Sequence, residues 1–93
     1  MNSLINLALI GASGVVGKKI ISLLENKNIE INNFYPVGST SVGGEIVFNN
    51  NEYKIEDLTN FDYTKANLAI FSAGSKVAEE HAKDFVNAGA YVI

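Results

Sequence analysis

The sequence predicts an α/β domain in which a doubly wound, mostly parallel sheet carries helices on both faces and a small hairpin insertion. Residues 4–10, 67–71 and 90–93 are short and almost continuously apolar, which is typical of strands buried on both faces of a parallel sheet. Helical periodicity follows the first two of these runs. Strands that alternate with amphipathic helices indicate βαβ units.

The first helix is expected directly after the first strand. From residue 16 the apolar positions follow the helical spacing i, i+4, i+7 and i+8; they are Val16, Ile20, Leu23 and Leu24. We expect this helix to end within residues 26–28. Residues 29–37 are predicted as the second strand, with Pro36 near its end, and residues 38–41 as a loop.

The middle of the chain is predicted to hold a β-hairpin. Residues Glu45–Phe48 and 52–55 flank three consecutive asparagines at positions 49–51, a residue type that tolerates the left-handed backbone of a tight turn. Residues 57–65 are polar, and we expect them to form a loop with at most one helical turn.

A second helix is expected after residues 72–75. The residues of its apolar face are Ala78, Ala82, Phe85 and Val86. Gly89 suits the position that follows such a helix. The apolar run 90–93 then begins another strand, and a strand this apolar needs neighbours. We therefore expect residues 1–93 to be the N-terminal part of a two-domain protein.

The composition excludes several classes of function. The chain has 93 residues and is 47% hydrophobic, which suits one domain at most. It has no cysteine, so it holds no disulfide and no cysteine nucleophile. A net charge of −3 without a basic run argues against nucleic acid as a partner. No apolar run is long enough to span a membrane and no signal peptide is evident, so we expect a cytoplasmic protein without a membrane partner.

Three evenly spaced glycines stand between the first strand and the first helix. Gly11 lets the chain leave the strand, Gly14 has no side chain that would keep a pyrophosphate from the backbone, and Gly17 lets the helix lie close to the sheet. Ser13 adds a hydroxyl donor. The spacing G-x-x-G-x-x-G differs from the commoner G-x-G-x-x-G. The alternative is a glycine turn that only reverses the chain.

A hydroxyl-rich loop follows the second strand. In NAD-binding domains a carboxylate at this place binds the ribose 2′-hydroxyl. Here Ser39, Thr40 and Ser41 stand instead, and no acidic residue follows before Glu45. Hydroxyls can donate to a 2′-phosphate, which a carboxylate would repel, so the loop favours NADP over NAD. The alternative is a solvated Ser/Thr loop.

Residues of the next strand–helix junction are expected to form the opposite wall of the same crevice. Ser72, Ala73 and Gly74 follow a strand that neighbours the first one in a doubly wound sheet. His81, the only histidine, lies one step off the apolar face of its helix, and we assign it a structural role. We expect no catalytic residue and no metal site within these 93 residues.

Three blocks of the chain resemble the N-terminal cofactor domain of the aspartate-semialdehyde dehydrogenase family. These blocks are "ALIGASGVVGKKIISLL", "VGSTSVGGEIVFNNNEYKIEDL" and "NLAIFSAGSKVAEEHAKDFVNAGAYVI". The middle block, a hairpin followed by "YKIEDL" and then by "FSAG", is the most discriminating. The resemblance implies a Rossmann-type fold. The residues that it implies in cofactor binding are Ser13, Gly14, Val15, Val16, Thr40, Ser41, Ser72, Ala73 and Gly74.

The resemblance also implies an activity for the whole protein. This is the NADP-dependent reductive dephosphorylation of L-aspartyl-4-phosphate to L-aspartate 4-semialdehyde, in the pathway to lysine, threonine and methionine, by a homodimer or homotetramer. It places the family's catalytic cysteine, histidine and substrate-binding arginines beyond Ile93. Many members have an arginine where Thr40 stands. Two alternatives stay open: the sister enzyme N-acetyl-gamma-glutamyl-phosphate reductase, and a non-catalytic dinucleotide-binding module.

Overall fold

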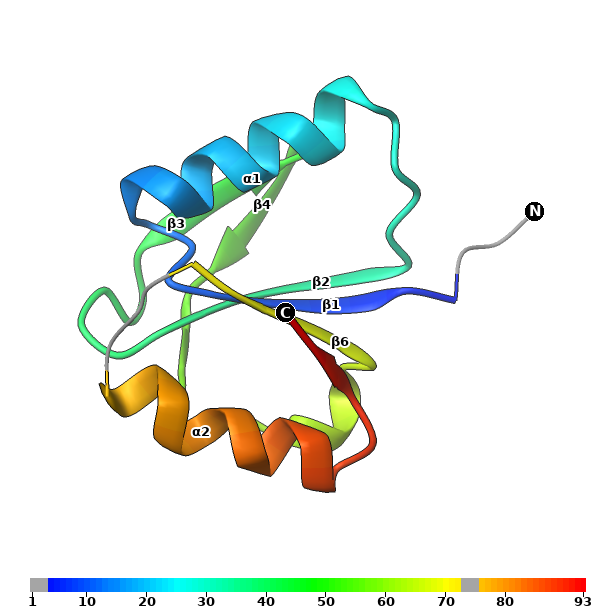
Figure 1. Cartoon of the computed structure of the whole chain (residues 1–93). Helices are drawn as coiled ribbons and strands as arrows, with labels where there is room; N and C mark the ends of the chain where they lie inside the picture. Colours follow the sequence, from blue (N-terminus) through cyan, green and yellow to red (C-terminus); the bar gives the residue numbers. More distant parts are fainter. Residues whose placement is uncertain (1–3, 73–75) are drawn as a thin grey trace.

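The protein is organised around a five-stranded parallel sheet. The computed structural model describes residues 4–72 and 76–93. The strand order is β5-β2-β1-β6-β7, and every neighbouring pair is parallel (Figure 1). The strands are β1 Asn6–Ile10, β2 Asn33–Gly38, β5 Glu56–Asp57, β6 Leu68–Phe71 and β7 Tyr91–Val92. The predicted parallel sheet is confirmed.

The two faces of the sheet are covered by different elements. Helix α1, Val15–Asn26, and the hairpin lie over one face, and helix α2, Lys76–Asn87, lies over the other (Figure 1). Successive residues of a strand point to opposite faces. Leu7 and Leu9 of β1 therefore join one buried cluster with residues of α1 and the hairpin, and Ala8 and Ile10 join a second cluster with Phe85 of α2.

Only part of the apolar face predicted for helix α1 faces the sheet: Ile20 and Leu24 do, and Val16 and Leu23 do not. Val16 and Leu23 were expected in the core, yet they are 52% and 54% exposed, whereas Ile21 is only 6% exposed. The buried stripe is Gly17, Ile20, Ile21 and Leu24. Gly17 packs directly on backbone, so the helix turns its glycine toward the sheet. A periodicity of large apolar residues does not include glycine, so it does not indicate the contact of Gly17 with the backbone.

The chain between α1 and β2 does not form the early part of the second strand. Asn28 has φ 53°, the left-handed conformation that ends many helices. Its N–H donates to Glu25 O at 3.2 Å, and the Ile29 N–H donates to Leu24 O at 3.1 Å. Ile29 therefore belongs to the helix end, residues 30–32 connect it to the sheet, and β2 begins at Asn33, not at residue 29.

The end of α2 follows the same pattern with a glycine. Gly89 has φ 95°, and the next N–H, that of Ala90, donates to Phe85 O at 2.9 Å, so the predicted role of Gly89 is confirmed.

The apolar face of α2 differs from the predicted one at Val86, which is 58% exposed. Residues 85 and 86 are about 100° apart around a helix, so when Phe85 is buried, Val86 lies at the border of the buried face. The Ala78 side chain lies outside the described residues.

The predicted hairpin is present with a tighter turn. Strand β3, Glu45–Phe48, pairs with β4, Asn51–Lys54, in antiparallel register. Only Asn49 and Asn50 form the turn, with φ 50° and 66°. Two left-handed residues are what a two-residue hairpin loop requires, so the third asparagine belongs to the strand.

The polar stretch after the hairpin contains one element that the sequence did not indicate. Residues 56–57 form β5, which pairs with the last two residues of β2, and Leu58 N–H donates to Gly38 O at 2.9 Å. A strand of two residues has no periodicity to detect. The expected single helical turn is present at Tyr63–Lys65.

Among the described residues, no helix is long and apolar enough to cross a membrane.

Candidate functional site

Three segments that the sequence assigned to cofactor binding meet at one edge of the sheet. The glycine loop follows β1, the Ser/Thr loop follows β2, and Ser72 follows β6. Because β2, β1 and β6 are adjacent and parallel, their carboxyl ends lie side by side (Figure 1). We call this place the carboxyl edge. The chain winds outward from β1 to β2 and then returns to β6 on the other side, and ligands of doubly wound sheets bind at such a reversal.

The first and third glycines of the loop are required by the fold itself. Gly11 has φ 86°, and its N–H donates to Val37 O at 2.8 Å. A Cβ atom on Gly17 would lie 2.3 Å from Gly11 O and 2.8 Å from Ala12 O. Backbone atoms cannot yield as a flexible side chain can. The close helix–sheet approach predicted for Gly17 is therefore confirmed.

Gly14 is different, because the protein leaves room for a side chain there. A Cβ atom on Gly14 would meet only Gly11 O, at an ordinary 3.4 Å. Its backbone, φ −74° and ψ 171°, is open to any residue. Packing within the described residues thus gives no reason for glycine at this position. Free space above the backbone is what an approaching ligand would need.

Gly14 is also the N-cap of α1, and among the described residues no side chain caps this helix end. Among the described residues, the first amide bonded in the helical pattern is that of Lys18, which donates to Gly14 O at 3.0 Å. Val15 and Val16 beside it are exposed. The first amides of a helix carry partial positive charge and attract anions, phosphate above all. This end of α1 therefore suits a phosphate group.

A hydrogen bond joins the glycine loop to the Ser/Thr loop. Ser13 Oγ donates to Ser41 Oγ at 3.1 Å, across 28 positions of sequence. Ser39 and Thr40 are exposed at the same edge, and Ser41 is half-buried. The structure thus joins the Ser41 hydroxyl to the residue before the N-cap of α1, although the sequence indicated the two loops separately.

The Ser72 side chain connects the end of β6 to the glycine loop. Ser72 Oγ lies 2.8 Å from Ile10 O and 2.9 Å from Gly11 O. The predicted neighbourhood of Ser72 and the first strand is therefore correct. Ala73 and Gly74 lie outside the described residues.

Lys18 and Lys19 point along the outer face of α1. Both are exposed, and with Val15 and Leu23 they line a shallow groove on the helix. The polar groups described at the carboxyl edge are thus backbone amides and hydroxyls. Among the described residues, no cluster of His, Asp and Glu could hold a metal ion.

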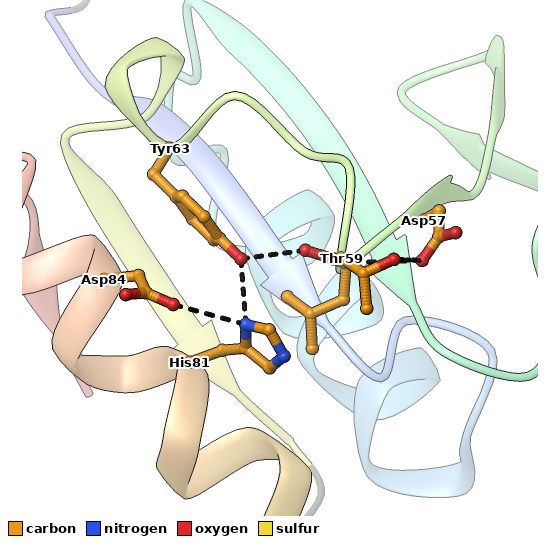
Figure 2. A network of polar contacts seen from close by, with 6 residues as sticks. Asp57, Thr59, Tyr63, His81 and Asp84 are labelled. Carbon is orange, nitrogen blue, oxygen red and sulfur yellow. Dashed lines mark hydrogen bonds and ion pairs between the residues drawn. The ribbon is translucent and has the colours of Figure 1, made fainter.

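The only histidine belongs to a separate polar network between the polar loop and α2 (Figure 2). Tyr63 Oη donates to Leu58 O at 2.9 Å and lies 2.8 Å from His81 Nδ1. A phenol has one proton, and a carbonyl only accepts, so His81 Nδ1 must carry a proton and donate to Tyr63. His81 Nδ1 also lies 3.4 Å from Asp84 Oδ2. These contacts agree with the structural role predicted for His81.

Two pKa shifts belong to this network and its surroundings. Burial raises the pKa of Tyr63, and the negative charges of Asp84 and Asp57 act in the same direction. The pKa of Asp57 is lowered, because its carboxylate accepts hydrogen bonds from the N–H and the hydroxyl of Thr59. The link between Tyr63 and His81 had no signal in the sequence, since it joins residues 18 positions apart in different elements.

The fold and the carboxyl edge together define a class of protein. A parallel sheet wound in both directions from β1, with an uncapped helix after a glycine turn at the reversal, is the architecture of a Rossmann-type dinucleotide-binding domain. Residues 6–93 match the family described as "Semialdehyde dehydrogenase, NAD binding domain". The chain belongs to this family.

Curated relatives and solved structures agree with this assignment. The whole chain is 40% identical to an aspartate-semialdehyde dehydrogenase of Legionella pneumophila, and 83% of it is 44% identical to one of Helicobacter pylori. It spans 27% and 23% of those two proteins. The structure superposes on aspartate semialdehyde dehydrogenase II of Vibrio cholerae with a TM-score of 0.91 and 26% identity, over 97% of this chain and 30% of that one.

Proposed function

We propose that residues 1–93 are the cofactor-binding part of an NADP-dependent aspartate-semialdehyde dehydrogenase. In this reaction a hydride and a proton convert L-aspartyl-4-phosphate to L-aspartate 4-semialdehyde, and inorganic phosphate leaves. The bound cofactor supplies the hydride. The nucleophilic cysteine, the acid–base histidine and the substrate-binding arginines belong to the rest of the protein. This proposal rests on the family match and on the relatives at up to 40% identity over the whole chain.

The observation that carries cofactor binding is the convergence at the carboxyl edge. The Ser13–Ser41 hydrogen bond places the Ser/Thr loop beside the uncapped end of α1. A dinucleotide with a 2′-phosphate carries negative charge at two places, the pyrophosphate and the ribose. The amides after Gly14 suit the first, and the hydroxyls of Ser39, Thr40 and Ser41 suit the second. Val15 and Val16 are the apolar residues beside the bound pyrophosphate.

The relatives' activity supports the remaining parts of the proposal. We propose that the protein acts in the cytoplasm, in amino-acid biosynthesis, as a homodimer or homotetramer. The substrate binds mainly to residues outside these 93.

The Ser/Thr loop gives a testable cofactor preference. No carboxylate follows β2 before Glu45, and no arginine occurs in the chain. We expect the full-length protein to bind NADP about 10- to 100-fold more tightly than NAD, which corresponds to about 1.4–2.7 kcal/mol. The test is a calorimetric titration of the parent and of the double variant Thr40→Ala/Ser41→Ala with each dinucleotide.

The double variant should lose most of this preference through weaker NADP binding, while NAD binding changes little. Ser22→Ala, on the exposed face of α1, is the matched control and should behave as the parent. Equal losses for NADP and NAD would mean that the loop supports the fold instead of binding the 2′-phosphate. A parent protein that prefers NAD would contradict the assignment of the loop.

A further inference from the structure

We propose that Ser72 is a positioning residue for dinucleotide binding: its hydroxyl holds the glycine turn in shape and donates no hydrogen bond to the cofactor. The inference rests on the proposed function, because it concerns the same edge of the sheet. It changes the role that the sequence assigned to Ser72, which was a direct contact on the opposite wall of the crevice.

The hydrogen bonds of Ser72 leave its hydroxyl without a free proton. Oγ lies 2.8 Å from Ile10 O and 2.9 Å from Gly11 O. Both are carbonyl oxygens, which only accept, so the single hydroxyl proton is shared between them. The Ser72 N–H also donates to Ile10 O, at 3.0 Å. A phosphate or a cofactor carbonyl would need a donor, and Ser72 has none left to offer.

The Gly11 carbonyl is the point where three segments meet. Besides the Ser72 hydroxyl from the end of β6, it accepts the Gly14 N–H at 3.1 Å. The bare Cα of Gly17 packs on the same oxygen, since a Cβ there would lie 2.3 Å away. The direction of this one carbonyl therefore affects both the N-cap and the packing of α1.

Gly11 needs an external constraint because it is glycine. Its φ of 86° lies in a region that glycine enters freely, together with several others, so local sterics do not select one orientation of the following peptide. The Ser72 hydroxyl supplies that selection from the neighbouring strand. If it is removed, the Gly11 carbonyl keeps only the Gly14 N–H as a donor, so the Gly11–Ala12 peptide and the amides after Gly14 gain freedom.

The fold itself should tolerate loss of the hydroxyl. In Ser72→Ala, Ile10 O keeps the bond from the residue-72 N–H, and Gly11 O keeps the bond from Gly14. No buried acceptor is therefore left without a donor. The change should appear in the order of the turn and in ligand binding.

The experiment compares Ser72→Ala, Ser72→Thr and the parent as full-length proteins, titrated with NADP and with adenosine 2′-monophosphate. The second ligand carries the 2′-phosphate and lacks the pyrophosphate. We expect Ser72→Ala to weaken NADP binding about tenfold and to leave adenosine 2′-monophosphate within twofold of the parent. Ser72→Thr keeps a hydroxyl and should restore NADP binding to within about threefold.

Hydrogen exchange of the Gly14 amide without ligand provides a second readout. It should be faster in Ser72→Ala than in the parent and in Ser72→Thr. NADP binding by Ser72→Ala within twofold of the parent, equal losses for both ligands, or unchanged exchange at Gly14 would each overturn the inference. A parent that binds neither ligand would instead refute the proposed function, while the Gly14 exchange comparison would still test Ser72.

Discussion

Polar groups at the carboxyl ends of the strands and at the starts of the strands differ in their hydrogen bonding. At the carboxyl edge the first amides of α1 have no side-chain cap, and Ser39 and Thr40 face solvent. At the opposite edge, where the strands begin, asparagine side chains bond the strand starts to one another. We call this the amino edge.

At the amino edge, four asparagines form hydrogen bonds that join the starts of neighbouring strands. Asn6 Oδ1 accepts hydrogen bonds from the Asn32 and Asn33 side-chain amides, at 3.0 and 2.9 Å. Asn67 Oδ1 accepts the Asn6 N–H at 2.8 Å, and Asn67 Nδ2 donates to Leu4 O at 2.6 Å. Asparagine side chains thus bond to one another and to backbone at the amino edge, whereas the first amides of α1 and the Ser39 and Thr40 hydroxyls stay available at the carboxyl edge. The difference indicates which edge is built for a ligand.

The strongest test of this comparison concerns the glycines of the carboxyl edge. Gly17→Ala should lower the free energy of unfolding by at least about 2 kcal/mol, because its Cβ would lie 2.3 Å from the Gly11 backbone oxygen and α1 would have to move. Urea titration of the domain measures this loss.

Gly14→Ala is the matched control, since its Cβ meets only one atom at 3.4 Å. Its stability should stay within about 1 kcal/mol of the parent, whereas its NADP affinity should fall. Equal stability losses in the two variants would show that both glycines serve packing alone.

The Tyr63 network allows a second test, because it lies beside the carboxyl edge and is nevertheless closed by protein groups. Leu58, which bonds to Gly38 at the end of β2, also accepts the Tyr63 hydroxyl. Tyr63→Phe removes two partly buried hydrogen bonds and should cost about 1–2 kcal/mol at pH 7. NADP affinity should not change.

This cost should depend on pH in a defined direction. The pKa of Tyr63 is raised in the folded state, above an unfolded value near 10. The protonated phenol therefore stabilises the fold fully below about pH 10, and the contribution is lost as pH rises through the folded pKa. Urea titrations at pH 8 and pH 11 should show parent and Tyr63→Phe converging. A gap that widens with pH would contradict the network.

The smallest effect is expected at the amino edge. Asn67→Ala removes two exposed hydrogen bonds and should lower the free energy of unfolding by about 1 kcal/mol. NADP binding should stay within twofold of the parent, because the change lies at the other end of β6. A large loss of NADP affinity in this variant would contradict the claim that only the carboxyl edge takes part in cofactor binding.

Local patterns predicted the parts of the fold that depend on local physics. Continuous apolar runs indicated β1 and β6. The asparagine run 49–51 and Gly89 indicated positions of left-handed backbone, although only two of the three asparagines adopt it. The buried side of α1 was predicted only in part. Gly17, Ile20 and Leu24 face the sheet as expected, whereas Ile21 is buried there in place of Val16 and Leu23.

The candidate site shows the same limit. Its three segments could be selected from the chain, since each follows an apolar strand. The Ser13–Ser41 bond and the two carbonyls that accept the Ser72 hydroxyl join residues 28 to 62 positions apart. No pattern within one segment reports such contacts, so the hydrogen bonds of Ser72 became visible only in the folded chain.

The most direct measurement of the central claim is amide hydrogen exchange of the full-length protein with and without saturating NADP. Our account predicts slower exchange at residues 13–17 and in the Ser/Thr loop at residues 39–41, and unchanged exchange at Asn6 and Asn67. Binding of NADP without protection at the carboxyl edge, or with its main protection at the amino edge, would contradict the account.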